Sequence, residues 1–305
     1  MFVLAHLSDP HIGPLPRPRL VDLMSKRIVG YANWWRSRAR VHRLAVLDAL
    51  TADLIAQPHD HTAVTGDLVN IALAAEFALA QTWLDRLGGP QNVSFVPGNH
   101  DAYVRGAAKH WDTHWDAFMR GDTEVVHGAT KVRFPYVRRR GQVALVGLST
   151  AVPTLPISAA GRLGRDQVER LVALLHRLAE ERLFRIVLIH HPPFTPLAKR
   201  LKRLVDGATF RNAIAQAGAE LVLHGHTHRR SLIWLKGPQA PVPVIGVSSA
   251  SAVPGHRDDA AAYNLYRISG EAGDWSCEVV TRGFRTGDDQ IGELDRRALS
   301  APGQS

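Results

Sequence analysis

Cysteine, methionine and long hydrophobic runs are scarce in this chain of 305 residues, which has one cysteine and three methionines. The single cysteine, Cys277, excludes an internal disulfide. It lies in a strand-like run, residues 275–281, which favours a buried and inert thiol in a reducing compartment. No apolar run approaches the roughly 18 residues that cross a bilayer, and no basic segment of a secretory signal precedes the first apolar strand. We therefore expect a soluble, cytoplasmic protein.

Acidic residues are in deficit, with 28 Asp and Glu against 37 Lys and Arg, so the net charge is +9 and the pI is about 10.2. This excess suits an anionic substrate or an anionic surface without distinguishing the two. The hydrophobic fraction of 45% is ordinary for a globular protein and supports a sizeable core.

Five short motifs carry the polar chemistry, and together they offer two carboxylates, a carboxamide and at least three imidazoles. They are Asp9-Pro10-His11, Gly66-Asp67, Gly98-Asn99-His100-Asp101, His190-His191-Pro192 and Gly225-His226-Thr227-His228. Imidazole and carboxylate together suit borderline divalent ions such as manganese, iron, zinc or cobalt, whereas calcium and magnesium sites are built almost entirely from oxygen. Two such ions about 3.5–4 Å apart can share a carboxylate and a hydroxide and stabilise both the attacking and the leaving oxygen at phosphorus. The motifs therefore predict phosphoester hydrolysis.

Each motif directly follows a run that is typical of a buried strand. The runs are residues 2–7, 61–65, 93–96, 185–189 and 220–223. In open α/β sheets ligands bind outside the carboxyl ends of the strands, so five such ends can converge on one site. Gly66, Gly98 and Gly225 fit this position, because a chain that turns tightly beside a metal often needs a residue without Cβ.

All five motifs, in this order, resemble those of the calcineurin-like metallophosphoesterases. The similarity is closest to the bacterial class III phosphodiesterases, in Gly66-Asp67-Leu68-Val69-Asn70 and in the intact Gly-Asn-His-Asp and Gly-His-Thr-His motifs. The resemblance implies two divalent metal ions, of manganese, iron, zinc or cobalt. It assigns Asp9, His11 and His228 to the first ion, Asn99, His190 and His226 to the second, and Asp67 to a position that bridges both.

The resemblance also gives roles to the residues beside these ligands. His190 is preferred to His191 as the ligand because the family places its histidine two residues before the proline. His100 would donate a proton to the leaving alkoxide or hold the phosphate, with Asp101 orienting its ring. The other histidines without a motif are predicted to be structural or solvent-facing, and they are His42, His59, His61, His110, His114, His127, His176 and His256.

The pattern of elements predicts an α/β protein. Helical periodicity appears in residues 44–55, 72–87, 105–119, 165–182 and 209–217. Strand pairs are expected at residues 131–138 with 142–148, 231–235 with 242–247, and 263–268 with 276–281, as a second and mainly antiparallel set. We expect a four-layer α/β/β/α sandwich of two mixed β-sheets flanked by helices, which the resemblance also implies. Residues 1–285 would form this one domain, and the polar residues 286–305 a loose tail.

A basic amphipathic insert, residues 20–44, separates the first two motifs. Its apolar residues Leu20, Leu23, Met24, Ile28 and Tyr31 fall at helical spacing, beside Lys26, Arg27, Arg36, Arg38, Arg40 and Arg43. The adjacent Trp34 and Trp35 lie at its centre. This composition is typical of a segment at a membrane interface, and equally of a helix that covers a sheet. The sequence leaves both open.

Part of the insert is weakly similar to metallophosphoesterases that cleave the pyrophosphate of UDP-2,3-diacylglucosamine. The similarity rests on Lys26-Arg27, Gly30 and Asn33-Trp34. A second basic segment, residues 196–211, could form the other wall of the entrance. The candidate substrate contacts are His191, Trp34, Trp35, Lys199 and Arg203. In this interpretation the protein is peripheral to the anionic inner face of a membrane.

The expected substrate is an anionic phosphoester. A nucleotide-type diester, as in cyclic nucleotide phosphodiesterases, is the first expectation, and the UDP-linked lipid is the alternative. Nucleic acid ranks third, because no repeat or recognition motif is present and Arg138-Arg139-Arg140 is expected to be a solvated hairpin turn. A binding scaffold without catalysis is disfavoured because every ligand is intact. The sequence does not indicate the substrate, the metals bound or the oligomeric state.

Overall fold

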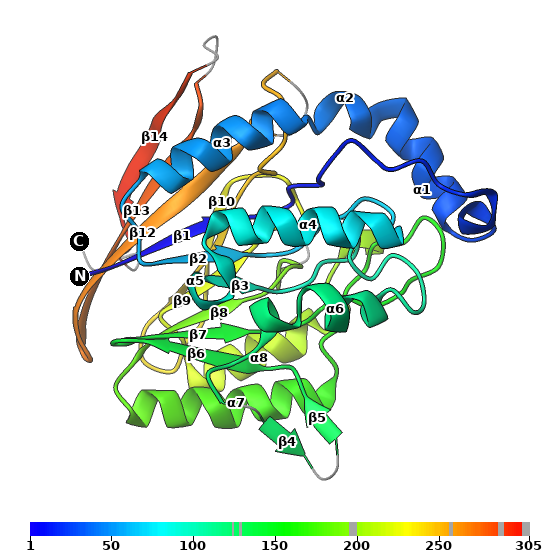
Figure 1. The fold of residues 1–305 in the computed structure, drawn as a ribbon. Coiled ribbons are helices and arrows are strands. Elements are labelled where there is room, and N and C mark those ends of the chain that lie inside the picture. The colour runs from blue at the N-terminus through cyan, green and yellow to red at the C-terminus, as the bar shows by residue number, and fades with distance from the viewer. Residues whose placement is uncertain (124, 128–129, 195–199, 256–258, 286–289, 301–305) are drawn as a thin grey trace.

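Two six-stranded β-sheets lie between layers of helices (Figure 1). The computed structural model describes residues 1–123, 125–127, 130–194, 200–255, 259–285 and 290–300. Alternate side chains of both sheets enter one shared apolar core, while the opposite face of the second sheet packs under its own helices. The predicted four-layer α/β/β/α sandwich is therefore confirmed.

The first sheet has the order β14-β13-β12-β1-β2-β3. Its parallel strands are β1 (Phe2–Leu7), β2 (His61–Val64) and β3 (Val93–Phe95), and the antiparallel ones are β12 (Ala262–Glu271), β13 (Asp274–Phe284) and β14 (Ile291–Ala298). Helices α3 (Leu44–Ala56) and α4 (Ala74–Leu87) cover its outer face (Figure 1). The short α5 (Gly89–Asn92) leads into β3.

The second sheet has the order β10-β11-β9-β8-β7-β6. Its strands are β6 (Tyr136–Arg140), β7 (Val143–Gly147), β8 (Phe184–Leu188), β9 (Leu221–His224), β10 (Ser231–Leu235) and β11 (Val242–Gly246). Helices α7 (Arg165–Glu180) and α8 (Gly207–Ala217) cover its outer face (Figure 1). Between the sheets in sequence lie α6 (Ala108–His114), η3 (Asp116–Met119) and the hairpin of β4 (Val125–His127) and β5 (Thr130–Val132).

The antiparallel strands do not form the separate set that is expected from the sequence. Strands β12, β13 and β14 extend the first sheet, and β6 and β10 form the two edges of the second. The loose tail is also wrong for residues 291–298, which form β14. This edge strand is rich in charged residues, and a polar edge strand has the composition of a tail. Residues 286–289 and 301–305 of the predicted tail lie outside the described residues.

The three consecutive arginines are not a solvated turn. Arg138 is only 3% exposed and donates hydrogen bonds to four backbone carbonyls, those of Pro90, Val93, Ala117 and Arg120. It thereby ties β6 to the segments around β3. The next two arginines form ion pairs, with Glu181 and Asp122. A buried cation is tolerated here because four of its five N–H donors are satisfied.

The insert extends beyond the edge of the sheets at which the parallel strands end (Figure 1, blue). It is largely helical, as expected. Its elements are η1 (Leu20–Leu23), α1 (Arg27–Asn33), the π-helical turn η2 (Trp34–Arg38) and α2 (Ala39–Val41). No helix among the described residues has the length and apolarity needed to span a bilayer.

Candidate metal centre and active site

The predicted ligands lie on strained loops that follow the strands. Five of the seven have a positive φ, and these are Asp9, His11, Asp67, His226 and His228, with values from 39° to 69°. This left-handed conformation costs roughly 1–2 kcal/mol for a residue other than glycine. Such strain persists where the surrounding structure fixes it, and it clusters at functional sites.

Hydrogen bonds between the loops bring the strand ends together. The amides of Asp9 and His11 donate to the carbonyls of Gly66 and Asp67, at 3.0 and 3.1 Å. Gly66 has φ +101°, and a Cβ at this position would collide with the ring of His190. A Cβ at Gly225 would collide with the Asp9 carboxylate. These two glycines allow the ligands of both sheets to approach one another.

The first ligand group joins Asp9, His11 and His228 to Asp67. The Nε2 atom of His228 lies 3.3 Å from Asp9 Oδ1 and 3.3 Å from His11 Nε2, and His11 Nε2 lies 4.0 Å from Asp67 Oδ2. Atoms that share one ion at about 2.1 Å are separated by about 3 to 4.2 Å, so these distances are those of a common ligand shell.

The second ligand group surrounds His190. Its Nε2 atom lies 3.4 Å from Asp67 Oδ2, 3.3 Å from Asn99 Oδ1 and 3.2 Å from His226 Nδ1. Asp67 Oδ2 thus faces His11 on one side and His190 on the other. The carboxylate occupies the position that a bridge between two ions requires.

The residues fit two divalent ions. His11, His190 and His226 each direct one ring nitrogen at a backbone carbonyl, those of Val69, Thr65 and Lys202, and so turn the other nitrogen toward the ligand groups. Although burial lowers the pKa of His190, the Asp67 and Asp9 carboxylates raise it to about 9, so its Nε2 carries a proton that a bound ion would displace. Burial lowers the pKa values of His11 and His226 well below the usual histidine range, which keeps both rings neutral. Asp9 Oδ1 is buried and receives no hydrogen bond, as expected of an atom that binds a cation.

His191 differs from His190 in having both nitrogens engaged. Its Nδ1 lies 2.7 Å from Thr150 Oγ1, and its Nε2 lies 3.0 Å from the carbonyl oxygen of Ala159. No lone pair is left for a metal in this arrangement. The geometry therefore favours His190 as the ligand, in agreement with the choice made from sequence.

His100 is held at the edge of the two groups. Its amide donates to Asp67 Oδ1 at 2.7 Å, and its Nδ1 lies 2.5 Å from the carbonyl oxygen of Asn70. Burial and the Arg38 guanidinium lower the pKa of His100 to about 3, so the ring is neutral. Its proton lies on Nδ1, because the carbonyl oxygen of Asn70 can only accept. A bound phosphate would favour the charged ring, since negative charge nearby raises a histidine pKa.

Asp101 has a different part from the one expected. Its carboxylate accepts hydrogen bonds from the backbone N–H groups of Asp67, Leu68, Val69 and Gly98, at 2.8 to 3.3 Å. Burial and the Asp67 charge raise the pKa of Asp101. The N–H groups of Gly98 and Val69 oppose this rise, and the net result is a pKa of about 8. Asp101 therefore clamps the loops after β2 and β3, while the His100 ring is oriented by Asn70.

The sequence of residues 2–230 matches the family model of the calcineurin-like phosphoesterases. The chain belongs to this family. Comparison with curated proteins gave no match. Among solved structures, a dimetal phosphatase from Danio rerio has a TM-score of 0.62 at 12% identity, covering 98% of this chain and 99% of its own. A purple acid phosphatase from yellow lupin (Lupinus luteus) seeds has a TM-score of 0.58 at 12% identity, covering 97% of this chain and 53% of its own. At these identities the likeness concerns the fold.

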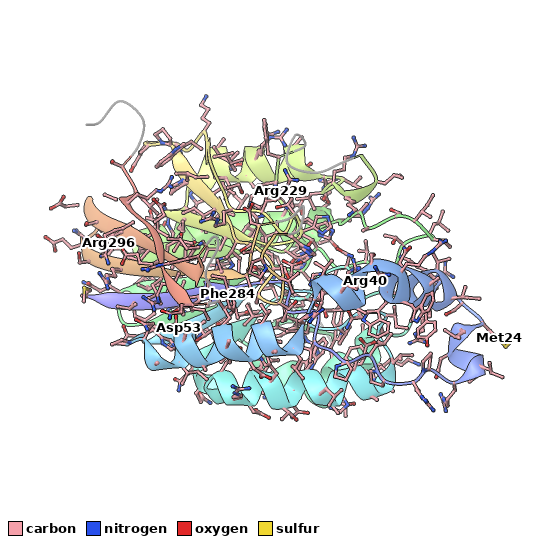
Figure 2. All side chains as sticks on the ribbon, turned by 90° about the horizontal axis from the view of Figure 1, so that it is seen from above. Met24, Arg40, Asp53, Arg229, Phe284 and Arg296 are labelled. Carbon is pink, nitrogen blue, oxygen red and sulfur yellow. The ribbon has the colours of Figure 1, made fainter. Side chains whose placement is uncertain are left out.

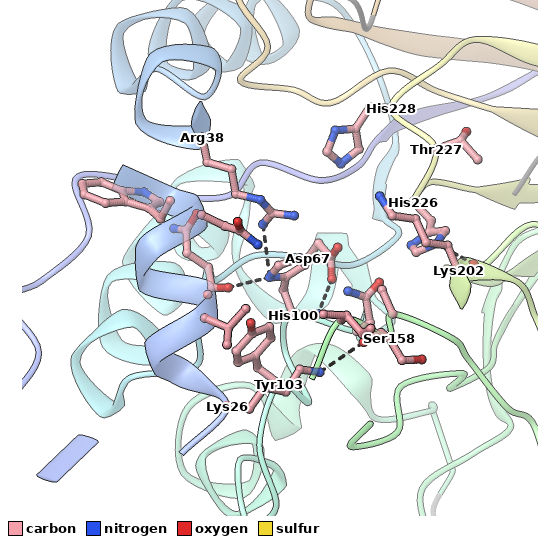
Figure 3. A pocket seen from close by; sticks show the side chains of 18 residues that line it. Lys26, Arg38, Asp67, His100, Tyr103, Ser158, Lys202, His226, Thr227 and His228 are labelled. Carbon is pink, nitrogen blue, oxygen red and sulfur yellow. Dashed lines mark hydrogen bonds between the residues drawn. The ribbon is translucent and has the colours of Figure 1, made fainter. Parts of the chain in front are cut away.

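In this calcineurin-like phosphoesterase the insert forms one wall of a cleft of about 240 Å³ over the ligands (Figure 3). Lys26, Trp34 and Arg38 line it from the insert, and Tyr103 and Lys202 from the core. Arg38, on the π-helical turn, places Nη1 3.2 Å from His100 Nδ1. Lys26 donates to Thr154 Oγ1 at 2.7 Å and to the carbonyl oxygen of Ser158 at 3.2 Å. The wall is therefore cationic.

The candidate substrate contacts divide into those at the cleft and those away from it. Trp34 lines the cleft, whereas Trp35 is 72% exposed and does not line it. Lys202 lies at the cleft where Arg203 was predicted. Lys199 lies outside the described residues. His191 is beside His226 but not at the cleft surface.

Sequence reasoning missed two residues of the site. In the sequence, Arg38 is one of several cations on the basic face of the insert. His42 was predicted to be structural or solvent-facing, yet its ring lies 4.6 Å from that of His11 and 5.3 Å from that of His228, between centroids. The one sequence signal for both was their position in an insert that joins two ligand-bearing strands.

Lys26 should make substrate binding sensitive to alkaline pH. Burial lowers its pKa to about 8, so the side chain loses its charge as the pH rises through about 8. We expect kcat/KM for an anionic substrate to fall over this range, because that parameter reports groups of the free enzyme. In Lys26→Arg, which stays protonated, the fall should move to higher pH. Superimposable profiles of the two proteins would contradict this role for Lys26.

Proposed function

We propose that the protein is a dinuclear metal-dependent phosphoesterase that hydrolyses a phosphodiester or pyrophosphate bond. The observation that carries the proposal is the position of Asp67 Oδ2 between the His11 and His190 ligand groups. Manganese, iron, zinc and cobalt all suit this mixture of imidazole, carboxylate and carboxamide. A pair of such ions, when bound, would neutralise charge on the phosphoryl group and supply an acidified water.

The chain's own residues then act around the phosphoryl group. Arg38 and Lys26 bind and orient the anion from the insert side of the cleft. His100 holds the phosphoryl oxygens or the leaving oxygen through Nε2, which carries a proton once the ring is charged. Asp101, Asn70 and Asp67 keep the loop of His100 in place through hydrogen bonds. A nucleotide-type diester is the first candidate substrate.

Phosphorus NMR tests the proposal with two substrates at once. Chelator-stripped protein is reloaded with manganese for the reaction and offered cyclic AMP and UDP-2,3-diacylglucosamine in detergent, and the products are read after the metal is removed. Appearance of AMP supports the nucleotide diester, and release of UMP supports the lipid pyrophosphate. If neither is cleaved, and no other diester or pyrophosphate is cleaved in a wider screen, the proposal is wrong.

A second candidate, hydrolysis of a UDP-linked lipid at an anionic membrane surface, is favoured by the outer side of the insert. Its apolar side chains are exposed, with Leu20 at 86%, Met24 at 85% and Ile28 at 57%. Met24 lies at the far tip, away from both sheets, and the basic Arg40 lies on the same insert (Figure 2). Exposed apolar side chains among cations are the chemistry of a segment at a lipid surface.

Membrane binding can be tested by sedimentation with vesicles of phosphatidylglycerol and phosphatidylcholine. Leu20→Ser with Met24→Ser should weaken binding by about 10²-fold, since each buried side chain of this kind contributes at least about 1.5 kcal/mol. A matched control is Ile55→Ser with Leu79→Ser, at exposed positions on α3 and α4. Absence of binding, or equal loss in both variants, would remove this candidate. Self-association of the wild-type protein in light scattering would assign the patch to a second copy instead.

A further inference from the structure

His42 lies inside the metal centre although no motif surrounds it. One ring nitrogen of each of His11, His42 and His228 lies within 4.8 Å of the other two. Two ligands on opposite sides of an ion at about 2.1 Å are about 4.2 Å apart, so the three imidazoles are close enough to share an ion with little adjustment. His42 comes from the end of the insert, directly after α2.

The backbone around His42 is fixed on both sides. Its amide donates to the carbonyl of Arg38 at 2.8 Å. The next amide, of Arg43, donates to the carbonyl of Ser251 at 3.0 Å. From the other side, the amide of Val253 donates to the carbonyl of Val41 at 2.9 Å. The end of the insert is thereby attached to the loop after β11. The backbone that carries the ring is therefore fixed by the fold.

The hydrogen bonds of the ring determine its tautomer. His42 Nδ1 lies 2.9 Å from Ser251 Oγ and 3.2 Å from Ser249 Oγ. The single hydroxyl proton of Ser249 is donated to the carbonyl of Asp9, at 2.6 Å, so toward His42 this oxygen can only accept. Ser251 Oγ lies 3.4 Å from Ser249 Oγ and can donate its own proton there, so it too can accept from His42. With the proton on His42 Nδ1 each of these contacts is a hydrogen bond, and Nε2 then carries the lone pair. This is the arrangement of a metal-binding imidazole, whose second nitrogen donates to a fixed acceptor.

We propose that His42 is a further ligand of the first metal ion, through Nε2. That ion would then have five protein ligands, Asp9, His11, His42, Asp67 and His228, and with one solvent oxygen six. The second ion keeps four, because the histidine in the comparable place, His191, has both nitrogens engaged. Six-fold coordination by nitrogen and oxygen suits manganese or iron better than zinc, which prefers four ligands. The inference rests on metal binding in the proposed function and not on its substrate.

Cobalt titration of the metal-free protein tests this without an activity assay. Calorimetry measures the affinity of the protein for each cobalt ion. Visible absorption reports the coordination number, because six-coordinate cobalt absorbs weakly and five-coordinate cobalt more strongly. In His42→Ala we expect one of the two sites to bind about 10- to 100-fold more weakly and its cobalt to absorb more strongly. Added imidazole should reverse both changes, which separates a lost ligand from a disturbed fold. His191→Ala is the control and should leave the first site as in the wild type, because His191 packs against His190 and His226 of the second.

Three results would contradict a role for His42 as a metal ligand. If His42→Ala binds both ions with the affinity and absorption of the wild-type protein, His42 is not a ligand. The same follows if imidazole fails to restore the lost site, or if His191→Ala weakens that site equally. A wild-type protein that binds both ions but cleaves no phosphoester would overturn the proposed function and leave this inference intact.

Discussion

Replacement of Asp67 by asparagine is expected to lower kcat for a phosphodiester by about 10³-fold or more. The carboxylate faces both ligand groups, so its loss removes charge from both ions at once. A bound ion contributes several kcal/mol of transition-state stabilisation, and each ~1.4 kcal/mol is a factor of ten in rate. The fold should persist, because the carboxamide oxygen introduced by Asp67→Asn can still accept the amide hydrogen of His100. Steady-state kinetics at saturating metal measures the effect.

The matched control for this variant is Asp53→Asn. Asp53 also pairs with cations and hydroxyls, since it accepts hydrogen bonds from Arg282 and Tyr263, but it does so on α3, away from the cleft. We expect it to cost stability and leave kcat within about threefold of the wild type. Full activity of Asp67→Asn with two metals bound would contradict the bridging role.

Replacement of His100 by alanine should have the second largest effect, and the effect should depend on the leaving group. A general acid contributes typically 10²- to 10⁴-fold, and we expect a loss of about this size for a diester with an alkyl leaving group. A p-nitrophenyl diester should lose less than about tenfold, because p-nitrophenolate leaves without being protonated. The two substrates are compared by kcat in one preparation of each protein.

The histidine control is His114→Ala, which removes a ring that bonds to Gln81 on α4, at 3.0 Å and away from the cleft. It should change neither rate. An equal loss for both leaving groups in His100→Ala would mean that His100 holds the phosphate and does not protonate the leaving oxygen. An unchanged rate for both would remove His100 from the reaction.

The strands, and the meeting of the seven candidate ligands at their ends, could be predicted from sequence for one physical reason. Buried parallel strands are continuous apolar runs, so their ends are visible as the point at which polar residues begin. Asp9, Asp67 and His190 follow such ends closely. The order of the motifs then specifies which polar side chains meet, because the carboxyl ends of neighbouring parallel strands lie together.

The remaining features of the site and the fold could not be predicted from the sequence, because they depend on long-range contacts that leave no local pattern. Arg138 has the composition of a solvated turn, and only the four carbonyls around it explain its burial. His42 and Arg38 reach the site because the insert folds back onto the loop after β11. The spacing of apolar residues in the insert does not predict this contact. Asp101 lies beside His100 in sequence, yet its hydrogen bonds go to the backbone of two loops.

A scaffold that kept the fold and lost catalysis is the account that differs most from ours. Such a scaffold tends to lose ligands, whereas all seven candidates are intact in this chain. Here the two groups meet at Asp67, and a cationic cleft opens over them. This arrangement favours an enzyme. Hydrolysis of a phosphoester by the fully metal-loaded protein would distinguish an enzyme from a scaffold.

Titration of the metal-free protein with manganese, with hydrolysis of bis(p-nitrophenyl) phosphate followed in parallel, shows whether hydrolysis needs two bound ions. We expect two ions to bind per chain, hydrolysis to appear as the second binds, and both to disappear with chelator. Binding of fewer than two ions, hydrolysis that persists in chelator, or two bound ions with no hydrolysis of this or any other phosphoester would each contradict a dinuclear phosphoesterase.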